Sequence, residues 1–283
     1  MALADDLRDY IAQHGTATTD VGLWPGPVIV GETHQFMFGD APIRTVASVR
    51  VLRELLKDLR FRYFANESFL NAGPARRALR DYWQNGRLPP ALDSTDPAQA
   101  ALGDDELARR VLTRRFQEVL DDLKLHPRYI LPIGSRMGGA VRDRRLAQHF
   151  LEEAGDRGVG RQTPGVVLLG LAHAAATPFE GDRATTRMIL QQQGYRCISI
   201  AVLTDFTRTK DGVITIDDAV VPLTGPAAIL RLAGLAAKSP ISVRTDHAMP
   251  AGKTNPFRQI ALAGSTSGRS VAEQYEFVVL HKT

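Results

Sequence analysis

Residues 165–171 read GVVLLGL, and this stretch is the clearest buried strand of the chain. A short aliphatic run of this kind is typical of a strand that is covered on both faces of a sheet. Residues 27–30 (PVIV) form a similar run, which ends at Gly31. Between the two runs, residues 43–59 repeat their apolar side chains at steps of three and four, which predicts a helix with one face toward a core.

Strand-like and helix-like segments alternate along most of the chain. Further strands are predicted at 62–67, 129–133, 195–203, 213–216 and 276–281, and further helices at 74–84, 104–125, 141–154 and 182–193. The alternation predicts an α/β fold, namely a three-layer domain with a largely parallel central sheet and helices on both faces. We expect one α/β domain over residues 1–283. Residues 70–127 can be interpreted as a helical lid inserted in it or as an ordinary packing layer.

The composition is that of an ordinary globular protein. Hydrophobic residues make up 44% of the chain, and 35 Lys and Arg against 31 Asp and Glu give a net charge of +4. The basic residues are scattered among acids, so no nucleic-acid partner is expected. Cys197 is the single cysteine, which excludes an intramolecular disulfide and a thiolate metal cluster. With no recognisable signal peptide or membrane-spanning stretch, we expect a cytoplasmic protein that does not bind membranes.

Polar side chains with catalytic or metal-binding chemistry follow three of the predicted strands. Glu32 and His34 follow the first strand, Glu67 closes the second, and His173 follows the GVVLLGL run. The carboxyl ends of parallel strands share one edge of a sheet, and ligands of open α/β sheets bind beyond that edge. We therefore expect these four side chains to lie close together.

Each of the four residues also has an ordinary structural explanation. Carboxylates at strand ends are commonly solvated or cap a helix, and a lone histidine is commonly a hydrogen-bonded surface residue. The pattern Gly-x-x-His occurs at both Gly31 and Gly170, which favours function because packing alone does not require histidine twice. We expect Gly31 to let the backbone turn sharply after its strand. Since His and Glu are ligands of hydrolytic zinc sites, the cluster predicts a metal site or an acid–base site.

Five short elements, taken in order, give the chain a resemblance to a known superfamily. They are GETH at 31–34, Glu67, RDRRLA at 142–147, GLAH at 170–173 and a terminal strand with an acid near its start at 275–280. This order and spacing are similar to those of the superfamily that joins erythromycin esterases, ChaN-type haem-binding proteins and TIKI (TraB) proteases. Leu146 stands where the family motif has methionine, and residues 205–270 do not align.

The resemblance implies a hydrolase that cleaves an ester or a peptide amide bond, with a small-molecule ester or a peptide as its partner. In one interpretation, His34, Glu67 and His173 bind a divalent metal ion (Zn or Mn) and Glu32 accepts a proton from the bound water. In the other, His34 is the general base without a metal, and Glu32 or Glu67 holds its tautomer. In both, Arg142 stabilises the developing oxyanion.

Three further expectations accompany this interpretation. Asp143 is expected to orient Arg142 or to cap its helix. His247 is the one additional histidine that is a candidate to reach the site. The alternative function is that of a haem-binding protein like the ChaN group, without catalytic activity and with haem as the cofactor.

Overall fold

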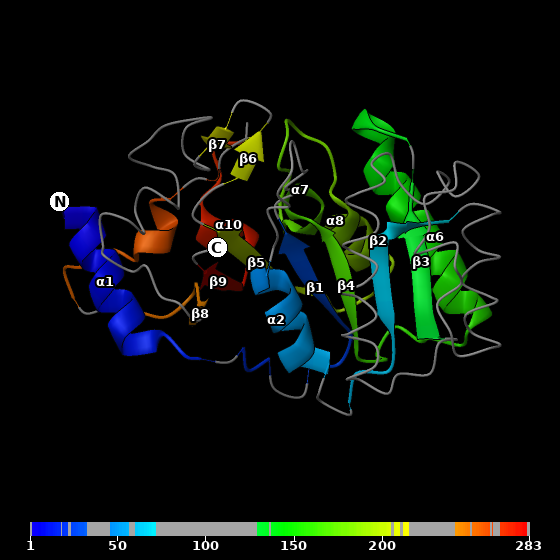
Figure 1. The fold of residues 1–283 in the computed structure, drawn as a ribbon, viewed down its shortest axis with the longest axis horizontal. Coiled ribbons are helices and arrows are strands. Elements are labelled where there is room, and N and C mark those ends of the chain that lie inside the picture. The colour runs from blue at the N-terminus through cyan, green and yellow to red at the C-terminus, as the bar shows by residue number, and fades with distance from the viewer. Residues whose placement is uncertain are drawn as a thin grey trace.

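A seven-stranded sheet forms the centre of the described part of the chain (Figure 1). The computed structural model describes residues 2–17, 19–21, 24–32, 46–56, 60–71, 129–135, 137–204, 207–209, 212–214, 241–249, 251–260, 262 and 267–281. The strands of this sheet are β1 (Pro27–Glu32), β2 (Phe64–Leu70), β3 (Ile130–Gly134), β4 (Gly165–Gly170), β5 (Ile198–Thr204), β8 (Ile241–Arg244) and β9 (Phe277–His281).

The sheet is parallel except at one edge. Its strands lie in the order β3-β2-β4-β1-β5-β9-β8. Neighbouring strands are parallel from β3 through β9, and β8 pairs antiparallel with β9. A separate two-stranded antiparallel hairpin joins β6 (Thr207–Thr209) to β7 (Gly212–Ile214). The predicted largely parallel sheet is therefore confirmed.

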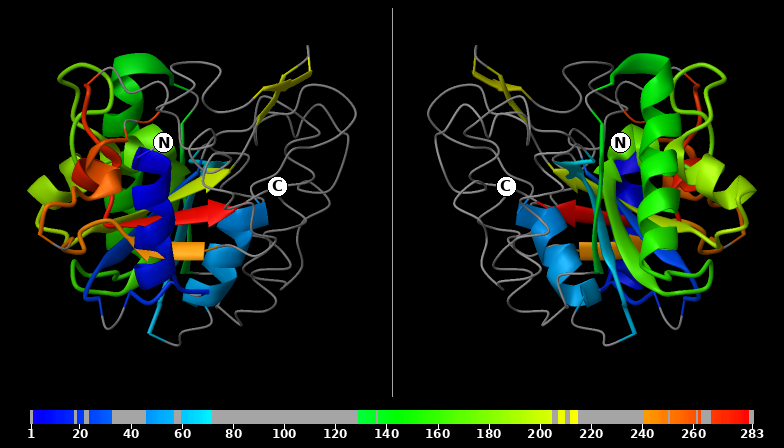
Figure 2. Two further views of the ribbon diagram at one scale, coloured as in Figure 1. Left: turned by 90° about the vertical axis from the view of Figure 1, so that its left-hand side faces the viewer. Right: turned by 90° about the vertical axis from the view of Figure 1, so that its right-hand side faces the viewer.

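Helices cover both faces of the sheet, so the architecture has three layers. The helices are α1 (Ala2–His14), α2 (Val46–Leu56), α6 (Arg142–Asp156), α7 (Leu171–Ala174), α8 (Thr186–Gln192) and α10 (Val271–Gln274), with 3-10 turns η3 (Gly139–Val141) and η5 (Pro256–Arg258). Helix α2 lies on one face, and α6 lies on the other (Figure 2). The predicted α/β class with helices on both faces is confirmed.

The two faces of the sheet belong to two separate hydrophobic cores. Successive residues of a strand point to opposite faces. Ile29 and Val167 accordingly pack in the core that includes side chains of α1, α6 and α8. Val28 and Val166, one position earlier, pack in the core that includes side chains of α2. All four are fully buried, which is why the strands need uninterrupted aliphatic runs rather than alternating polar residues.

Strands β1 and β4 are neighbours, but the chain leaves them in opposite directions. After β1, the next described helix is α2, on one face, and the chain continues to β2. After β4, it passes through α7 and α8 on the other face and continues to β5. Because β2 and β5 lie on opposite sides of the β4–β1 pair, the strand order reverses here. Ligands of open α/β sheets bind beyond the carboxyl ends of the strands at such a reversal.

Most of the predicted elements are present, with ends shifted by a few residues. The strands predicted at 27–30, 62–67, 129–133, 165–171, 195–203 and 276–281 are β1, β2, β3, β4, β5 and β9, and the hairpin strand at 213–216 is β7. The helices predicted at 43–59, 141–154 and 182–193 are α2, α6 and α8.

Some elements were not predicted, and others lie outside the described residues. Strand β8 falls in the segment rich in Gly, Pro, Ser and Thr, and only its two central residues are buried, so it lacks a long apolar run. Helix α1 was also not predicted. The helices predicted at 74–84 and 104–125, and with them nearly all of the 70–127 lid interpretation, lie outside the described residues. The extent of one domain over 1–283 stays a prediction.

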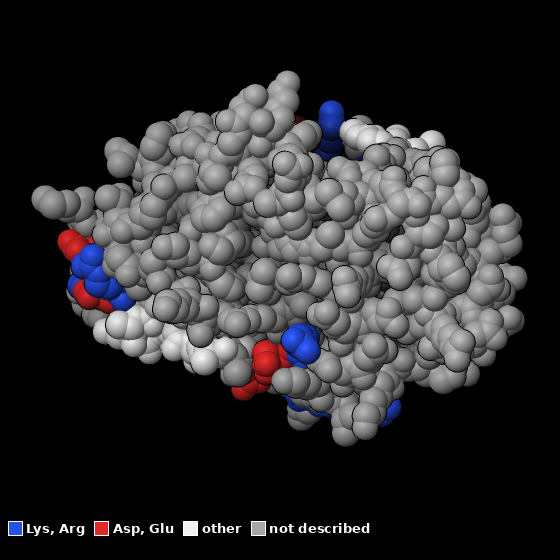
Figure 3. All heavy atoms as spheres, in the orientation of Figure 1, with Lys and Arg blue, Asp and Glu red and all other residues white. Residues whose placement is uncertain are grey.

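Two surface properties of the described segments bear on possible partners. No helix in these segments has both the length and the apolar character needed to cross a lipid bilayer. On the face drawn in Figure 3, acidic and basic side chains of the described residues lie side by side in two small groups. The expectation that the protein does not bind nucleic acid stays a prediction.

Gly165 provides a test of the close packing at the start of β4. A Cβ atom at this position would lie 2.2 Å from the ring of Tyr63, which is fully buried. Gly165→Ala is therefore expected to lower the free energy of unfolding by about 1–3 kcal/mol, measured by urea unfolding. The matched control is Gly155→Ala in α6, where an added Cβ meets nothing within 4 Å. The control is expected to raise stability by about 0.5–1 kcal/mol, and equal effects of the two changes would contradict the packing.

Candidate active site

His173 lies directly beyond the carboxyl end of β4. It is the third residue of the short helix α7, which begins immediately after Gly170. In the sheet, Gly170 is the partner of Glu32, the last residue of β1. Glu32 and the helix that carries His173 therefore share the edge where the strand order reverses, which is where ligand-binding residues are expected.

His173 forms a hydrogen-bonded pair with Asp143 of α6. The Nδ1 atom of His173 lies 2.9 Å from Oδ1 of Asp143, and their side chains are 16% and 20% exposed. The same Oδ1 accepts hydrogen bonds from the backbone N–H of Thr186 at 2.6 Å and from Thr186 Oγ1 at 2.7 Å. A carboxylate acceptor at Nδ1 favours the tautomer with its proton on Nδ1, which leaves Nε2 as the free acceptor of the ring.

The contacts of Asp143 differ from the expected ones. We expected Asp143 to orient Arg142 or to cap its own helix. Its Oδ1 instead reaches α7 and the first residue of α8, which are 30 and 43 residues further along the chain. Thr185 caps α8, since its Oγ1 accepts from the N–H of Met188 at 3.2 Å. A partner this distant in sequence leaves no local pattern, so the Asp143–His173 pair could not be predicted from spacing.

Gly31 has a different task from the one predicted. We expected it to allow a sharp turn, but it lies within β1 and is paired with Leu169 of β4. A Cβ atom on Gly31 would lie 2.8 Å from Cβ of Ala174 and 3.3 Å from Cα of Leu171. Since both of these residues belong to α7, the missing side chain allows the helix that carries His173 to lie directly against β1.

The two glutamates of the predicted cluster are both buried. Glu32 is 7% exposed and Glu67 is 4% exposed. Gly31 faces α7, so the alternation of the strand places Glu32 on the opposite side, toward α2. Glu67 was predicted to close its strand, but it lies within β2, which continues to Leu70 and shifts register against β3 between Asn66 and Leu70.

The remaining predicted residues are placed less completely. Arg142 is the half-buried first residue of α6, and its Nε is buried without a hydrogen bond to any described residue. Its predicted task at an oxyanion stays a prediction. His34 lies outside the described residues, so its tasks as metal ligand or general base also stay predictions.

His247 lies away from the cluster, at the other end of the sheet. Its ring stacks on that of His14 in α1, with 4.2 Å between ring centroids. Its backbone N–H donates to the hydroxyl of Tyr10, also in α1, at 3.0 Å. The suggestion that His247 reaches the site is therefore wrong, because it belongs to the segment after the edge strand β8 and packs against the N-terminal helix.

The predicted metal site is only partly described. Among the described residues, no three His, Cys, Asp or Glu side chains lie together in a way that could hold a metal ion. The predicted set of His34, Glu67 and His173 includes a residue outside this part of the chain. The bond from His173 Nδ1 to Asp143 fits a metal ligand, since a metal-bound histidine commonly donates its other ring N–H to a carboxylate.

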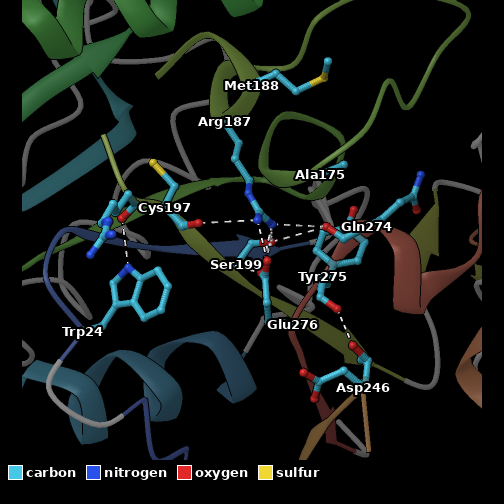
Figure 4. A network of polar contacts seen from close by, with 12 residues as sticks. Trp24, Ala175, Arg187, Met188, Cys197, Ser199, Asp246, Gln274, Tyr275 and Glu276 are labelled. Carbon is cyan, nitrogen blue, oxygen red and sulfur yellow. Dashed lines mark hydrogen bonds and ion pairs between the residues drawn. The ribbon is translucent and has the colours of Figure 1, made fainter. Parts of the chain in front are cut away.

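An ion pair between a buried arginine and a partly exposed glutamate was missed by the sequence interpretation (Figure 4). Arg187 of α8 is 3% exposed, and its Nη1 lies 2.9 Å from Oε2 of Glu276, directly before β9. Its Nη2 bonds the other carboxylate oxygen, Oε1. The only sequence signal for this pair was the acid near the start of the terminal strand, and its arginine partner stands 89 residues earlier.

The buried thiol of Cys197 is not a candidate nucleophile. The thiol is 4% exposed, and burial is the main reason that its pKa rises to about 12. Glu276 raises this pKa further, and the positive charge of Arg187 opposes the rise. Because the thiolate is the reactive form, a thiol that keeps its proton is inert at neutral pH.

Comparisons with known proteins find similarity of fold. No protein-family model and no curated protein matches the sequence. A protein from Bacillus cereus is similar in structure, with a TM-score of 0.56 at 10% identity over 99% of this chain and 97% of that one. A succinoglycan biosynthesis protein has a TM-score of 0.56 at 11% identity over 100% and 98% of the two chains.

An erythromycin esterase variant in its open conformation is more distant. It has a TM-score of 0.42 at 13% identity, over 92% of this chain and 91% of that one. Similarities at these identities concern the fold alone, and this last one is too low to support an argument. The comparisons therefore support the fold, and the family resemblance drawn from the sequence stays a prediction.

The buried thiol predicts a pH dependence of stability. The pKa of the Cys197 thiol rises from 9.0 in the unfolded chain to about 12 in the folded protein, so the folded state keeps this proton to higher pH. The free energy of unfolding is therefore unaffected by this group below about pH 9 and falls as the pH rises toward about 12. Urea unfolding at several pH values measures the fall, which Cys197→Val should reduce. Rapid reaction of the thiol with DTNB in the folded protein at about pH 8 would contradict the assignment.

Proposed function

We propose that the chain is a hydrolase that cleaves an ester or peptide amide bond with water activated at the edge of the sheet. The observation that carries this proposal is the Asp143–His173 pair beyond β4, with Nδ1 and Oδ1 2.9 Å apart. A carboxylate that fixes the tautomer of an imidazole is the arrangement that makes Nε2 a general base. The pair stands at the strand-order reversal, where α/β proteins bind their ligands.

In the proposed reaction, Nε2 of His173 accepts a proton from a water molecule as its oxygen attacks the carbonyl carbon of the substrate. Asp143 stabilises the imidazolium that forms, because its carboxylate stays bonded to Nδ1–H. The carbonyl oxygen becomes an oxyanion, for which Arg142 is the proposed donor. The tetrahedral intermediate then expels the alcohol or amine, which takes the proton back from Nε2.

The buried glutamates would act on the charge of the site. Glu67 is buried in β2, the neighbour of β4, and in the proposal its carboxylate favours the imidazolium of the intermediate. Glu32 borders the same edge from the side of α2. In the proposal, the substrate lies between Glu32 and His173.

A metal-assisted form of this reaction is also proposed. His34, Glu67 and His173 would hold a divalent ion, Zn or Mn, which when bound lowers the pKa of a water molecule. In this form His173 would hold the ion through Nε2, Asp143 would orient the ring through Nδ1, and Glu32 would be the nearby proton acceptor. Elemental analysis of the purified protein distinguishes the two forms. Stoichiometric metal that is lost in His173→Ala supports the metal form, and ester hydrolysis that survives chelation supports the metal-free one.

The haem-binding alternative stays a prediction, and none of the described contacts favours it. Titration with haemin tests it directly. A saturable Soret band, together with absent hydrolysis, would favour this alternative over the hydrolase.

Substitution of the pair is expected to abolish most of the activity. Hydrolysis of p-nitrophenyl esters and of a peptide anilide should fall by about 10²–10⁴-fold in His173→Gln and in Asp143→Asn, because both changes remove the oriented base. The matched control is His149→Gln in α6, whose ring bonds the carbonyl of Ile133 at 3.1 Å. It should keep its activity. Undiminished hydrolysis in His173→Gln would overturn the proposed function.

A further inference from the structure

The two residues that hold Asp143 are carried by very short helices. Helix α7, with His173, has 4 residues, and α8, which begins at Thr186, has 7 residues. Isolated helices of this length are not stable in water. The positions of His173 and Thr186 must therefore be fixed by contacts with the rest of the fold.

The segment at the end of α10 and the start of β9 holds α7. The hydroxyl of Tyr275 donates to the backbone carbonyl of Leu171, the first residue of α7, at 2.9 Å. The N–H of Ala176, just after α7, donates to the backbone carbonyl of Gln274 at 2.9 Å. Tyr275 is 1% exposed, and burial raises the pKa of its hydroxyl, so the donor proton is retained. Both ends of α7 are thus tied to two consecutive residues.

The next residue of the same segment, Glu276, holds α8. Its carboxylate bonds both terminal nitrogens of Arg187, and its Oε2 also accepts from the N–H of Ser199 in β5 at 2.7 Å. The guanidinium additionally bonds Ser199 Oγ and lies 3.4 Å from the carbonyl oxygens of Gln274 and Cys197 (Figure 4). A buried guanidinium with its carboxylate allows little freedom, because separating the two leaves a charge without a partner in the interior.

Thr186 is the neighbour of Arg187 in the chain, so the same ion pair fixes both. The side chain of Thr186 is fully buried, and both its N–H and its hydroxyl donate to Oδ1 of Asp143. With two donors in place, the Asp143 oxygen that faces His173 Nδ1 cannot rotate away without losing them.

We infer that residues 274–276 are the positioning element of the site. Through Leu171 they fix the position of His173, and through Arg187 and Thr186 they fix the position of Asp143. The contact between His173 and Asp143 then sets the tautomer of His173. Arg187, Glu276 and Thr186 are positioning residues in this scheme, since they act on the imidazole through Asp143. The catalytic importance of this tautomer rests on the proposed function. The geometry itself can be tested without an activity assay.

The test is the tautomer of His173 by long-range ¹H–¹⁵N NMR of the full chain, at a pH beyond the end of its titration. His173→Gln assigns the signal. The wild-type ring should be predominantly the Nδ1–H tautomer. Glu276→Gln breaks the bidentate contact with Arg187, so the N–H and hydroxyl donors of Thr186 in α8 are no longer held against Asp143. The ratio of Nδ1–H to Nε2–H should therefore fall by about tenfold or more.

Two controls separate positioning from a general loss of stability. Asp9→Asn makes the same acid-to-amide change in an exposed ion pair with Lys253. Val279→Ala creates a cavity in the core on the α2 side, without touching α8. Both variants should leave the tautomer ratio unchanged. This should hold even if Val279→Ala lowers the unfolding temperature as much as Glu276→Gln does.

Thr186 supplies a second test that does not alter a charged side chain. Thr186→Val removes the hydroxyl donor with little change of shape and should lower the tautomer ratio, and Thr186→Ser should restore it. If Glu276→Gln does not fold, this pair decides the question. An unchanged ratio in folded Thr186→Val, or in folded Glu276→Gln, would overturn the inference. A wild-type ring in the Nδ1–H form with no hydrolysis of any ester or peptide would instead overturn the proposed function alone.

Discussion

The ion pair between the buried Arg187 and the partly exposed Glu276 is the interaction on which the candidate site depends. Burying a guanidinium without a partner is costly, and Arg187, which is 3% exposed, is met by both carboxylate oxygens of Glu276. That requirement joins α8 to β5 and β9 in one relative position. The helices that carry His173 and Thr186 are too short to be stable alone. The polar network behind the sheet edge, and not the helices themselves, therefore gives the site its geometry.

The reversal of strand order explains why polar residues from both faces can border one site. The next described helix after β1 is α2, on one face, and α7 follows β4 on the other face, so these adjacent strands are followed by helices on opposite faces. Glu32 stands on the first side and His173 on the second, although Glu32 is paired with Gly170, three residues before His173. Gly31 lets α7 lie against β1 at this point. The close packing of a glycine and the divergence of the chain thus place an acid and an imidazole at one edge.

The fold could be predicted from the sequence because its signals are local. Aliphatic runs and three- and four-residue repeats identify buried strands and helices directly, although the half-buried strand β8 and the 13-residue helix α1 escaped. The positions of Glu32 and His173 at strand ends were predictable for the same reason, whereas Glu67 lies within β2 and not at its end. The pairings were not: Asp143 finds His173 across 30 residues and Arg187 finds Glu276 across 89. Such partners are chosen by tertiary packing, which no local spacing encodes.

The place of β9 in the sheet has a consequence for the order in which the molecule assembles. This strand follows the others in sequence, yet it lies between β5 and β8. On a ribosome, the segment with His173 emerges long before Glu276, and β8 has no neighbour in the sheet until β9 arrives. Contacts across such separations carry a large entropy of loop closure and form late. A partly synthesised chain therefore contains both Asp143 and His173 but lacks residues 274–276, whose contacts keep the two side chains together.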